Sequence, residues 1–215
     1  ITLSGDISDD GNGTGVDSEG GGTVILTGNN TYKDRTAVRA DTLLLLNGDN
    51  SVATGTVFLQ ANGTLGGTGV IGGTVNVQGG VHAPGSDGCG VQSCLTNVTY
   101  QTGSAVRWQL GANSVAGRGT AFDGIDVGGN LSFGTAVALA LEFNQAGSTV
   151  AWTNQFWNVN RQWLIWDVSG ETTGFDALSI TAADWEDANG LLFATVRPES
   201  FFTLVESNGG IYLKY

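Results

Sequence analysis

The residues that could carry out catalysis gather around position 120. Arg118, Asp123 and Asp126 are close together in the sequence, and Glu142 follows in the next apolar segment. Several carboxylates beside a basic residue are the groups that enzymes use to cleave polysaccharides. In FDGIDV, at positions 122–127, the carboxylates alternate with apolar residues as in a half-exposed strand, so their spacing does not indicate a catalytic pair. We therefore expect no catalytic residue and no enzymatic activity.

The acidic residues near the N-terminus could bind a hard cation such as calcium. Asp6, Asp9, Asp10, Asp17 and Glu19 lie in a stretch rich in Gly and Ser, and calcium takes several oxygen ligands from a flexible loop. The stretch has neither the spacing of an EF-hand nor a glycine-rich nonapeptide repeat. We expect these carboxylates to be solvated, with no bound metal and no cofactor.

The two cysteines are five positions apart in the glycine-rich segment GCGVQSC at positions 88–94. Such a loop can bring two Cβ atoms within bonding distance, so we expect a local disulfide between Cys89 and Cys94. A zinc site would need further Cys or His ligands, and His82 is the single histidine of the chain.

Five of the six tryptophans lie after position 150, which predicts a second core rich in aromatic side chains. Aromatic faces can also stack on sugar rings. In the segment WLIW, strand geometry places Trp163 and Trp166 on opposite faces, so at least one of them is a candidate glycan contact. The competing interpretation is that both rings pack in the core.

The composition of the 215-residue chain indicates an all-β protein. It has 35 glycines, two prolines and no methionine, with 40% hydrophobic and 13% charged residues. Disorder would require more charge and fewer apolar groups, and glycine follows no collagen period. The glycines stand beside Thr, Val, Leu and Asn, a mixture typical of many short strands joined by tight turns.

The formal net charge of −12 argues against nucleic acid as a partner, because eight scattered Lys and Arg residues offer little basic surface. No apolar run approaches the roughly 18 residues of a membrane span, so no membrane-spanning helix is expected. The sequence opens at Ile1 rather than Met, which we interpret as export and an extracellular or cell-surface location.

A repeat led by threonine appears after position 22. Each unit consists of a turn, a threonine and a short apolar strand, and the units begin at Thr23, Thr42, Thr56, Thr64 and Thr74. The steps from Thr23 to Thr42, Thr42 to Thr64 and Thr56 to Thr74 span 19, 22 and 18 residues. These lengths are close to one coil of a β-solenoid, in which parallel strands of successive coils stack and bury an apolar ladder.

The segment LTGNNTYKDRTAVRADTLLLLNG, at positions 26–48, resembles the autotransporter-associated β-strand repeat of bacteria. The later segment GTLGGTGVIGGTVNVQGGVHAPG, at positions 63–85, is similar to the coil that follows in these proteins. The resemblance implies a right-handed parallel β-helix that is secreted or exposed on the cell surface, with no particular chemistry. Positions 122–133 and 153–170 resemble the tails of secreted bacterial proteins that carry PEP-CTERM sorting signals.

These patterns divide the chain into three regions. Residues 1–22 are an N-terminal strand followed by a linker rich in Gly and Asp, and residues 23–95 are solenoid repeats that end in the cysteine loop. Residues 96–215 are an aromatic-rich β region that continues the solenoid or forms a sandwich. The best helix candidate is Ala182–Asn189, with Thr181 as its cap.

The N-terminal strand carries the leading hypothesis about function. A solenoid ends in open strand edges, and open edges pair with other chains unless they are capped. If residues Ile1, Thr2, Leu3, Ser4, Gly5, Asp6 and Ile7 add to the next copy, head-to-tail contacts that do not close form a filament. The leading interpretation is therefore a secreted structural subunit that associates with itself.

Two alternatives differ in class from this hypothesis. The first is a surface adhesin or carbohydrate-binding β-helix that uses exposed aromatic rings. The second, less favoured, is a β-helical polysaccharide lyase or hydrolase built on the carboxylates around position 120.

Overall fold

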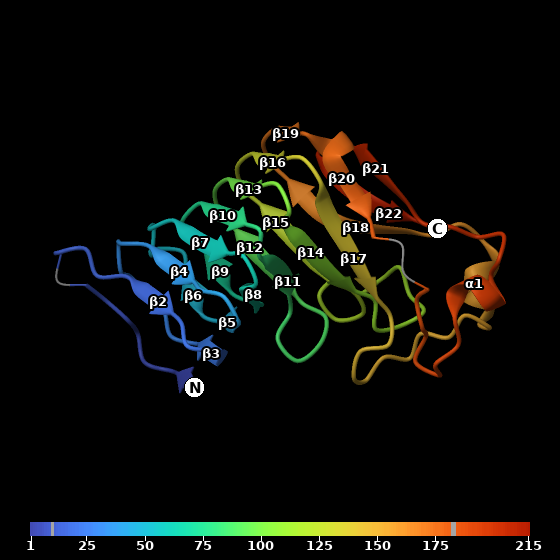
Figure 1. Cartoon of the computed structure of the whole chain (residues 1–215), viewed down its shortest axis with the longest axis horizontal. Coiled ribbons are helices and arrows are strands. Elements are labelled where there is room, and N and C mark those ends of the chain that lie inside the picture. The colour runs from blue at the N-terminus through green and yellow to red at the C-terminus, as the bar shows by residue number, and fades with distance from the viewer. Residues whose placement is uncertain (10, 182–183) are drawn as a thin grey trace.

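The computed structural model describes residues 1–9, 11–181 and 184–215 of the chain. Three long sheets run side by side along the molecule, and each coil of the chain contributes strands to them in turn (Figure 1). Almost every strand pairs in parallel with the equivalent strand of the next coil. The prediction of an all-β parallel solenoid is confirmed.

The first sheet, sheet A, extends the full length of the solenoid. Its strands, in spatial order, are β1 (Thr2–Leu3), β3 (Gly22–Leu26), β5 (Thr42–Leu46), β8 (Thr64–Gly67), β11 (Val81–Pro84), β14 (Ala105–Gln109), β17 (Val137–Glu142) and β20 (Leu178–Ile180). Three of these strands, β3, β5 and β8, begin at or beside threonines of the repeat, because the tight turn ends there and the extended segment starts.

The other two sheets complete the coil. Sheet B contains β2 (Val16–Ser18), β4 (Thr36–Val38), β7 (Val57–Gln60), β10 (Val75–Gln78), β13 (Val98–Tyr100), β16 (Leu131–Phe133) and β19 (Thr172–Thr173). Sheet C contains β6 (Asp49–Asn50), β9 (Val70–Ile71), β12 (Val91–Cys94), β15 (Gly124–Val127) and β18 (Gln162–Val168), followed by the antiparallel strands β22 (Gly210–Lys214) and β21 (Thr203–Ser207). The solenoid therefore continues well past the cysteine loop.

Alternation along each strand builds the core. In β17 every second residue is buried, as expected when one face of a strand looks into the solenoid. Parallel register then stacks the buried residues of successive coils into columns. One such column in sheet A consists of Leu44, Leu65, His82, Val106 and Leu139.

The N-terminal segment forms the first coil of the solenoid. Strand β1 pairs in parallel with β3, and β2 pairs with β4, although the sequence around β2 predicts a linker. Short polar segments become strands here because the next coil offers them a ready row of backbone partners.

The coils lengthen toward the C-terminus. Thr64 pairs with Val81, 17 positions later, whereas Val137 pairs with Leu178, 41 positions later. The added residues lie mainly between sheets A and C, in loops along the lower edge of Figure 1. These loops are residues 85–90, 110–123 and 143–161.

The long loops bury the aromatic core that the tryptophans predict. Phe143 and Trp152 have ring centroids 4.8 Å apart, and Trp152 lies equally close to Trp157. Phe193 and Phe202 join the same cluster at 5.2 Å. The short helices η1 (Gln155–Asn158), η2 (Phe175–Ala177) and α1 (Phe193–Val196) lie in the connections of this region.

The prediction of a helix over Ala182–Asn189 is wrong for residues 184–189. Residues 182–183 lie outside the described residues, and from Asp184 the chain has no helical turn before α1. Instead, Glu186 bridges to Leu192, and the Asp187 carboxylate accepts hydrogen bonds from the backbone of Asn189 and Leu191. Asp therefore closes a turn here, a role that competes with helix.

A column of glycines marks the corner between sheets A and C. A Cβ atom at Gly28 would overlap the Gly5 carbonyl, one at Gly48 the Gly28 carbonyl, and one at Gly69 the Gly48 carbonyl. Each glycine therefore allows one coil to lie directly on the coil before it. Gly5 differs, because a Cβ atom there would meet nothing within 4 Å.

We expect Gly48→Ala to lower the free energy of unfolding by about 2 kcal/mol, because the new methyl group forces two coils apart. Gly5→Ala is the matched control and should change it by less than about 0.5 kcal/mol. Urea unfolding followed by circular dichroism measures both. Equal stability of the two variants would contradict the glycine column.

Candidate functional site

Arg118 forms an ion pair with Asp126 of its own coil and hydrogen bonds with the next coil. The guanidinium Nη1 lies 2.6 Å from the Asp126 carboxylate. It also donates through Nε to the Leu164 carbonyl at 3.1 Å and through Nη2 to the Ile165 carbonyl at 3.4 Å. These carbonyls lie where β18 bulges, and a bulge leaves backbone groups without regular ladder partners. Arg118 supplies those partners from the preceding coil.

Asp123 is buried below the surface and binds backbone. Its two carboxylate oxygens accept hydrogen bonds from the N–H groups of Gly90, at 2.8 Å, and Gln109, at 2.9 Å. Burial raises the pKa of Asp123 to about 8, against the effect of these hydrogen bonds, which favour the charged form. The side chain thus anchors the loop 85–90 to β14, and it is fully buried.

Glu142 lies near Asp123 through a shared partner, Gln109. The Glu142 carboxylate accepts a hydrogen bond from Gln109 Nε2 at 2.8 Å and lies 3.8 Å from Arg107 Nε, whereas Asp123 accepts from the Gln109 backbone. Each carboxylate that the sequence singled out is therefore engaged in a hydrogen bond or ion pair within the protein. These contacts explain the residues structurally, and the absence of catalysis stays a prediction.

Trp163 and Trp166 both pack in the core, as the competing interpretation predicts, so neither is the candidate glycan contact. Trp163 is 1% exposed and Trp166 is fully buried. The register of β18 shifts between Leu164 and Trp166, and this bulge turns both indoles to the same side. Trp163 Nε1 donates to the Ser114 carbonyl at 2.7 Å, so the ring is also fixed by a hydrogen bond. Neither ring offers a face to a glycan.

The predicted disulfide is absent, because Cys89 and Cys94 are both free thiols. Cys94 is the last residue of β12 and points into the core, whereas Cys89 lies in the loop 85–90, with Sγ 3.8 Å from the Gln109 carbonyl. The extended strand between them carries the two Cβ atoms apart at about 3.3 Å per residue. Burial raises the pKa of Cys89 to about 11 and that of Cys94 to about 12.

The residues predicted as an inter-subunit strand pair with their own chain. The Ile1 carbonyl accepts a hydrogen bond from Ile25 N at 2.8 Å, and the Leu3 carbonyl accepts one from Thr27 N at 3.1 Å. Ile7 N donates to the side chain of Asn30 at 2.8 Å. Residues 1–7 therefore complete the first coil, and their exchange between copies stays a prediction.

Three acidic residues of the N-terminal segment also form contacts that join the first coil to the second. Asp10 lies outside the described residues, and Glu19 is exposed. No group of three or more His, Cys, Asp or Glu side chains within the described part of the chain is arranged to hold a metal ion. The remaining candidates contact backbone or arginine: Asp6 accepts from Asn29 N, Asp9 accepts from Lys33 N, and Asp17 pairs with Arg39.

A buried polar network crosses the interior where His82 replaces an apolar residue of the core column. His82 Nδ1 lies 2.8 Å from the Tyr100 hydroxyl, and Nε2 lies 2.8 Å from Gln92 Oε1. Gln92 Nε2 donates to the Gly66 carbonyl, and Trp166 Nε1 donates to the Tyr100 hydroxyl. The network joins all three sheets. Burial lowers the pKa of His82 to about 4.

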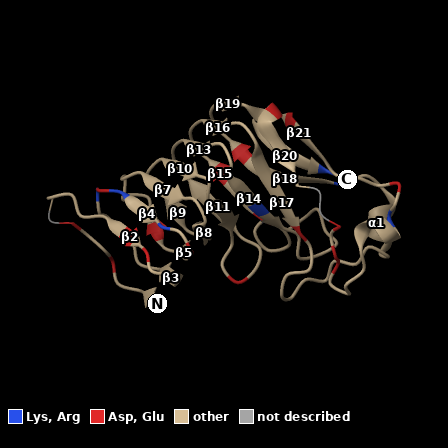
Figure 2. Cartoon of the chain, viewed as in Figure 1, with Lys and Arg blue, Asp and Glu red and all other residues tan. Residues whose placement is uncertain are grey.

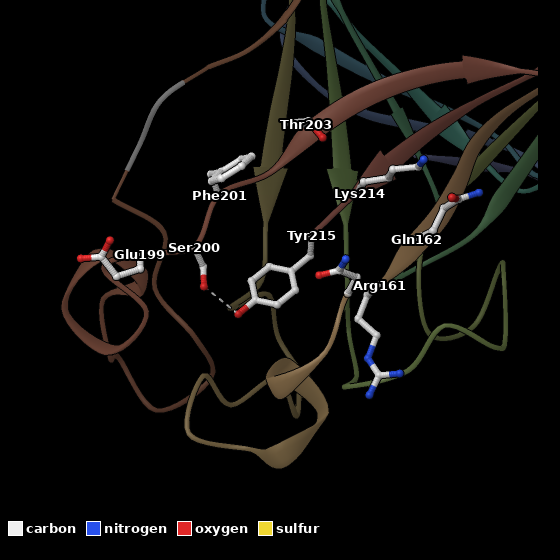
Figure 3. Close-up of a pocket in the computed structure, with 9 residues that line it drawn as sticks. Arg161, Gln162, Glu199, Ser200, Phe201, Thr203, Lys214 and Tyr215 are labelled. Atoms are coloured by element: carbon white, nitrogen blue, oxygen red, sulfur yellow. Dashed lines mark hydrogen bonds between the residues drawn. The ribbon is translucent and has the colours of Figure 1, made fainter.

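A hollow lies at the C-terminal end of the solenoid, where β18, β21 and β22 meet the loop before β18 (Figure 3). This C-terminal pocket has a volume of about 540 Å³. Its lining combines two cations, one acid, two aromatic rings, two amides and two hydroxyls: Arg161, Lys214, Glu199, Phe201, Tyr215, Asn160, Gln162, Ser200 and Thr203.

The sequence prediction missed this pocket because its lining comes from separate stretches of the chain. One signal was available in the adjacent pair Phe201 and Phe202. Neighbouring side chains of an extended segment point to opposite sides, so both rings cannot enter one core. Phe202 is buried in the aromatic cluster, and Phe201 is 69% exposed at the pocket.

The chain is similar to part of a bacterial adhesin. It is 44% identical over 119 residues to the adhesin BmaC autotransporter of Brucella suis biovar 1, a match that covers 54% of this chain and 3% of that protein. It is also 33% identical over 99 residues to an extracellular serine protease of Serratia marcescens, covering 46% of this chain and 9% of that protein. The chain thus spans a small fraction of each relative's length.

No protein-family model matches the chain. Among the described residues, no helix is long and apolar enough to cross a membrane.

We expect the stability of the protein to fall by about 3 kcal/mol as the pH drops from 6.5 to about 4, through His82 alone. In this window the unfolded state binds a proton and the folded state does not, so protonation favours unfolding. In His82→Gln this part of the pH dependence should vanish. Urea unfolding of both proteins across the window measures it, and parallel pH profiles would show that His82 does not titrate this way.

We also expect both thiols to resist alkylation by iodoacetamide in the folded protein, since burial disfavours the reactive thiolate. In denaturant without reductant, both should be alkylated, as mass spectrometry can count. If instead neither cysteine is alkylated in denaturant and the two are found oxidised to each other, the predicted disulfide between Cys89 and Cys94 would be supported.

Proposed function

We propose that this chain is a secreted or cell-surface structural β-solenoid whose copies associate end to end into a filament. The observation that carries the proposal is the parallel order of the strands in two sheets. Within the described residues, β1 and β20 are the outermost strands of sheet A, and β2 and β19 are the outermost strands of sheet B. Open parallel edges accept further strands of the same kind.

The relatives support the location. One is named as an autotransporter adhesin and the other as an extracellular protease, so the names place these two relatives at the cell surface or outside the cell. The sequence similarity extends over about half of this chain, most of which is solenoid. We extend the same location to this chain.

The polarity of the edges supports end-to-end association. Because sheet A is parallel throughout, β1 of one copy can follow β20 of another with the same strand direction. Ile1 and Leu3 are 76% and 40% exposed, so the N-terminal edge also presents apolar side chains. A contact between two different ends of identical copies does not close, and it therefore propagates as a filament.

The hydrogen bonds of β1 show which groups are free for a second copy. The Ile1 and Leu3 carbonyls face β3 and accept its N–H groups. In a parallel strand the N–H and C=O of one residue point to one side and those of its neighbours to the other. Those of Thr2 therefore point outward. The route that uses the outward groups of Thr2 adds an intact first coil to the next copy. Exchange of residues 1–7 between copies would instead reuse the Ile1 and Leu3 carbonyls, and assembly by a variant without the Thr2 N–H would indicate that route.

A surface adhesin is the second candidate, favoured by the similarity to an adhesin and by the C-terminal pocket. We do not advance the polysaccharide-cleaving alternative, because Asp123 is fully buried and Asp126 and Glu142 are engaged with Arg118, Gln109 and Arg107.

We expect Thr2→Pro to abolish filaments and leave the monomer folded, because proline removes the outward N–H and spares the bonds to β3. Thr2→Val keeps the N–H and is the matched control that should still assemble. Deletion of residues 1–7 should also abolish assembly. Negative-stain electron microscopy and sedimentation velocity measure the outcome.

Two results would contradict the proposal. One is a wild-type protein that stays monomeric at every concentration tested. The other is filament formation at the wild-type level by the variant that lacks residues 1–7, with circular dichroism showing that each variant is folded.

A further inference from the structure

We propose that the C-terminal pocket binds a uronic-acid unit of an anionic polysaccharide. The inference is independent of filament assembly and rests on four features of the pocket: its unpaired cations, its exposed aromatic ring, its row of polar side chains and its rigid floor.

The two cations of the pocket are free to bind an anion. The chain has eight Lys and Arg residues in all, and Arg39, Arg107 and Arg118 form ion pairs with carboxylates. Neither Arg161 nor Lys214 forms an ion pair within the described residues. Figure 2 shows how sparse the cations are beside the acidic residues. The lining also includes one carboxylate, Glu199, so the two cations leave the cavity with a net positive charge in a chain of net charge −12, and this favours a carboxylate ligand.

Arg161 is held in place without using its terminal nitrogens. Its Nε donates to the Phe156 carbonyl at 2.8 Å, and the guanidinium carbon lies 4.2 Å from the centroid of the Phe156 ring. Its backbone N–H and C=O pair with those of Tyr215 at 3.0 Å. A planar guanidinium fixed in this way can meet a carboxylate with two parallel hydrogen bonds at little cost in side-chain entropy.

The polar row lies on three adjacent strands. Gln162 of β18 is opposite Lys214 of β22, and Lys214 is opposite Thr203 of β21. An amide, an ammonium and a hydroxyl therefore stand side by side at one edge of the pocket. Ring hydroxyls of a sugar need donors and acceptors at this spacing, and a carboxylate needs the cation between them.

The aromatic residues complete a sugar site. Phe201 is 69% exposed, and an exposed aromatic face stacks on the C–H face of a pyranose ring. Tyr215 forms the floor, fixed by hydrogen bonds from its hydroxyl to the Trp157 carbonyl at 2.9 Å and with Ser200 Oγ at 3.0 Å. The volume of about 540 Å³ falls within the roughly 300–1,000 Å³ typical of small-ligand sites.

The test is isothermal titration calorimetry of the full chain with an oligogalacturonate. We expect saturable binding that weakens with added salt, and no binding of a neutral cello-oligosaccharide of the same length. Lys214→Gln and Phe201→Ala should each weaken binding about tenfold. Both side chains are at least partly exposed and Lys214 has no ion-pair partner, so both variants should fold.

Matched controls separate the pocket from general charge and general hydrophobicity. Arg35→Gln removes a cation in the N-terminal coils, and Val159→Ala shortens an apolar side chain that is 55% exposed outside the pocket lining. Both should bind like wild type. Titration of Thr2→Pro, which we expect to be monomeric, shows whether binding is independent of assembly.

Three results would overturn the proposal. They are the absence of oligogalacturonate binding, equal binding of the neutral oligosaccharide or of polyglutamate, and wild-type affinity in both Lys214→Gln and Phe201→Ala. Equal binding of polyglutamate would identify an acidic peptide, rather than a sugar, as the ligand class.

Discussion

The structure depends on parallel coils that lie directly on one another, at the spacing of about 4.8 Å that backbone hydrogen bonds impose. This spacing leaves no room for a Cβ atom at the corner where Gly28, Gly48 and Gly69 follow one another. It also places equivalent residues of successive coils in contact, so that burial in one coil requires burial in the next. Stability therefore comes from nearest-neighbour stacking, and no single coil could bury its apolar face alone.

The same constraint accounts for the use of polar residues inside the protein. A buried polar group is costly unless it is hydrogen-bonded, and the solenoid provides partners from the adjacent coil. His82 reaches Tyr100 and Gln92 from two other sheets, and Asp123 holds backbone N–H groups of two segments. Ionisable side chains such as His82 and Asp123 thus form the hydrogen bonds that join neighbouring coils and sheets.

The two ends of the solenoid differ physically. At the N-terminal end, the first coil is short and contributes β1 and β2, the outermost described strands of sheets A and B. Toward the C-terminus, long loops build an aromatic cluster, and the antiparallel strands β22 and β21 extend sheet C. The second end combines the outermost strands β19 and β20 with the C-terminal pocket. An end-to-end contact and a bound ligand would therefore lie close together at this end.

The sequence by itself determined the fold class, because the threonine-led units alternate apolar and polar residues over short strands separated by turns. Such local patterns depend only on neighbouring residues, and they predicted the parallel coils and the aromatic second core. Tertiary structure decided what depends on contacts between coils. The bulge in β18 turned Trp166 inward, strand β12 separated Cys89 from Cys94, and pairing with the second coil ordered the N-terminal segment. The pocket likewise exists only where separate stretches of the chain converge, which no local pattern encodes.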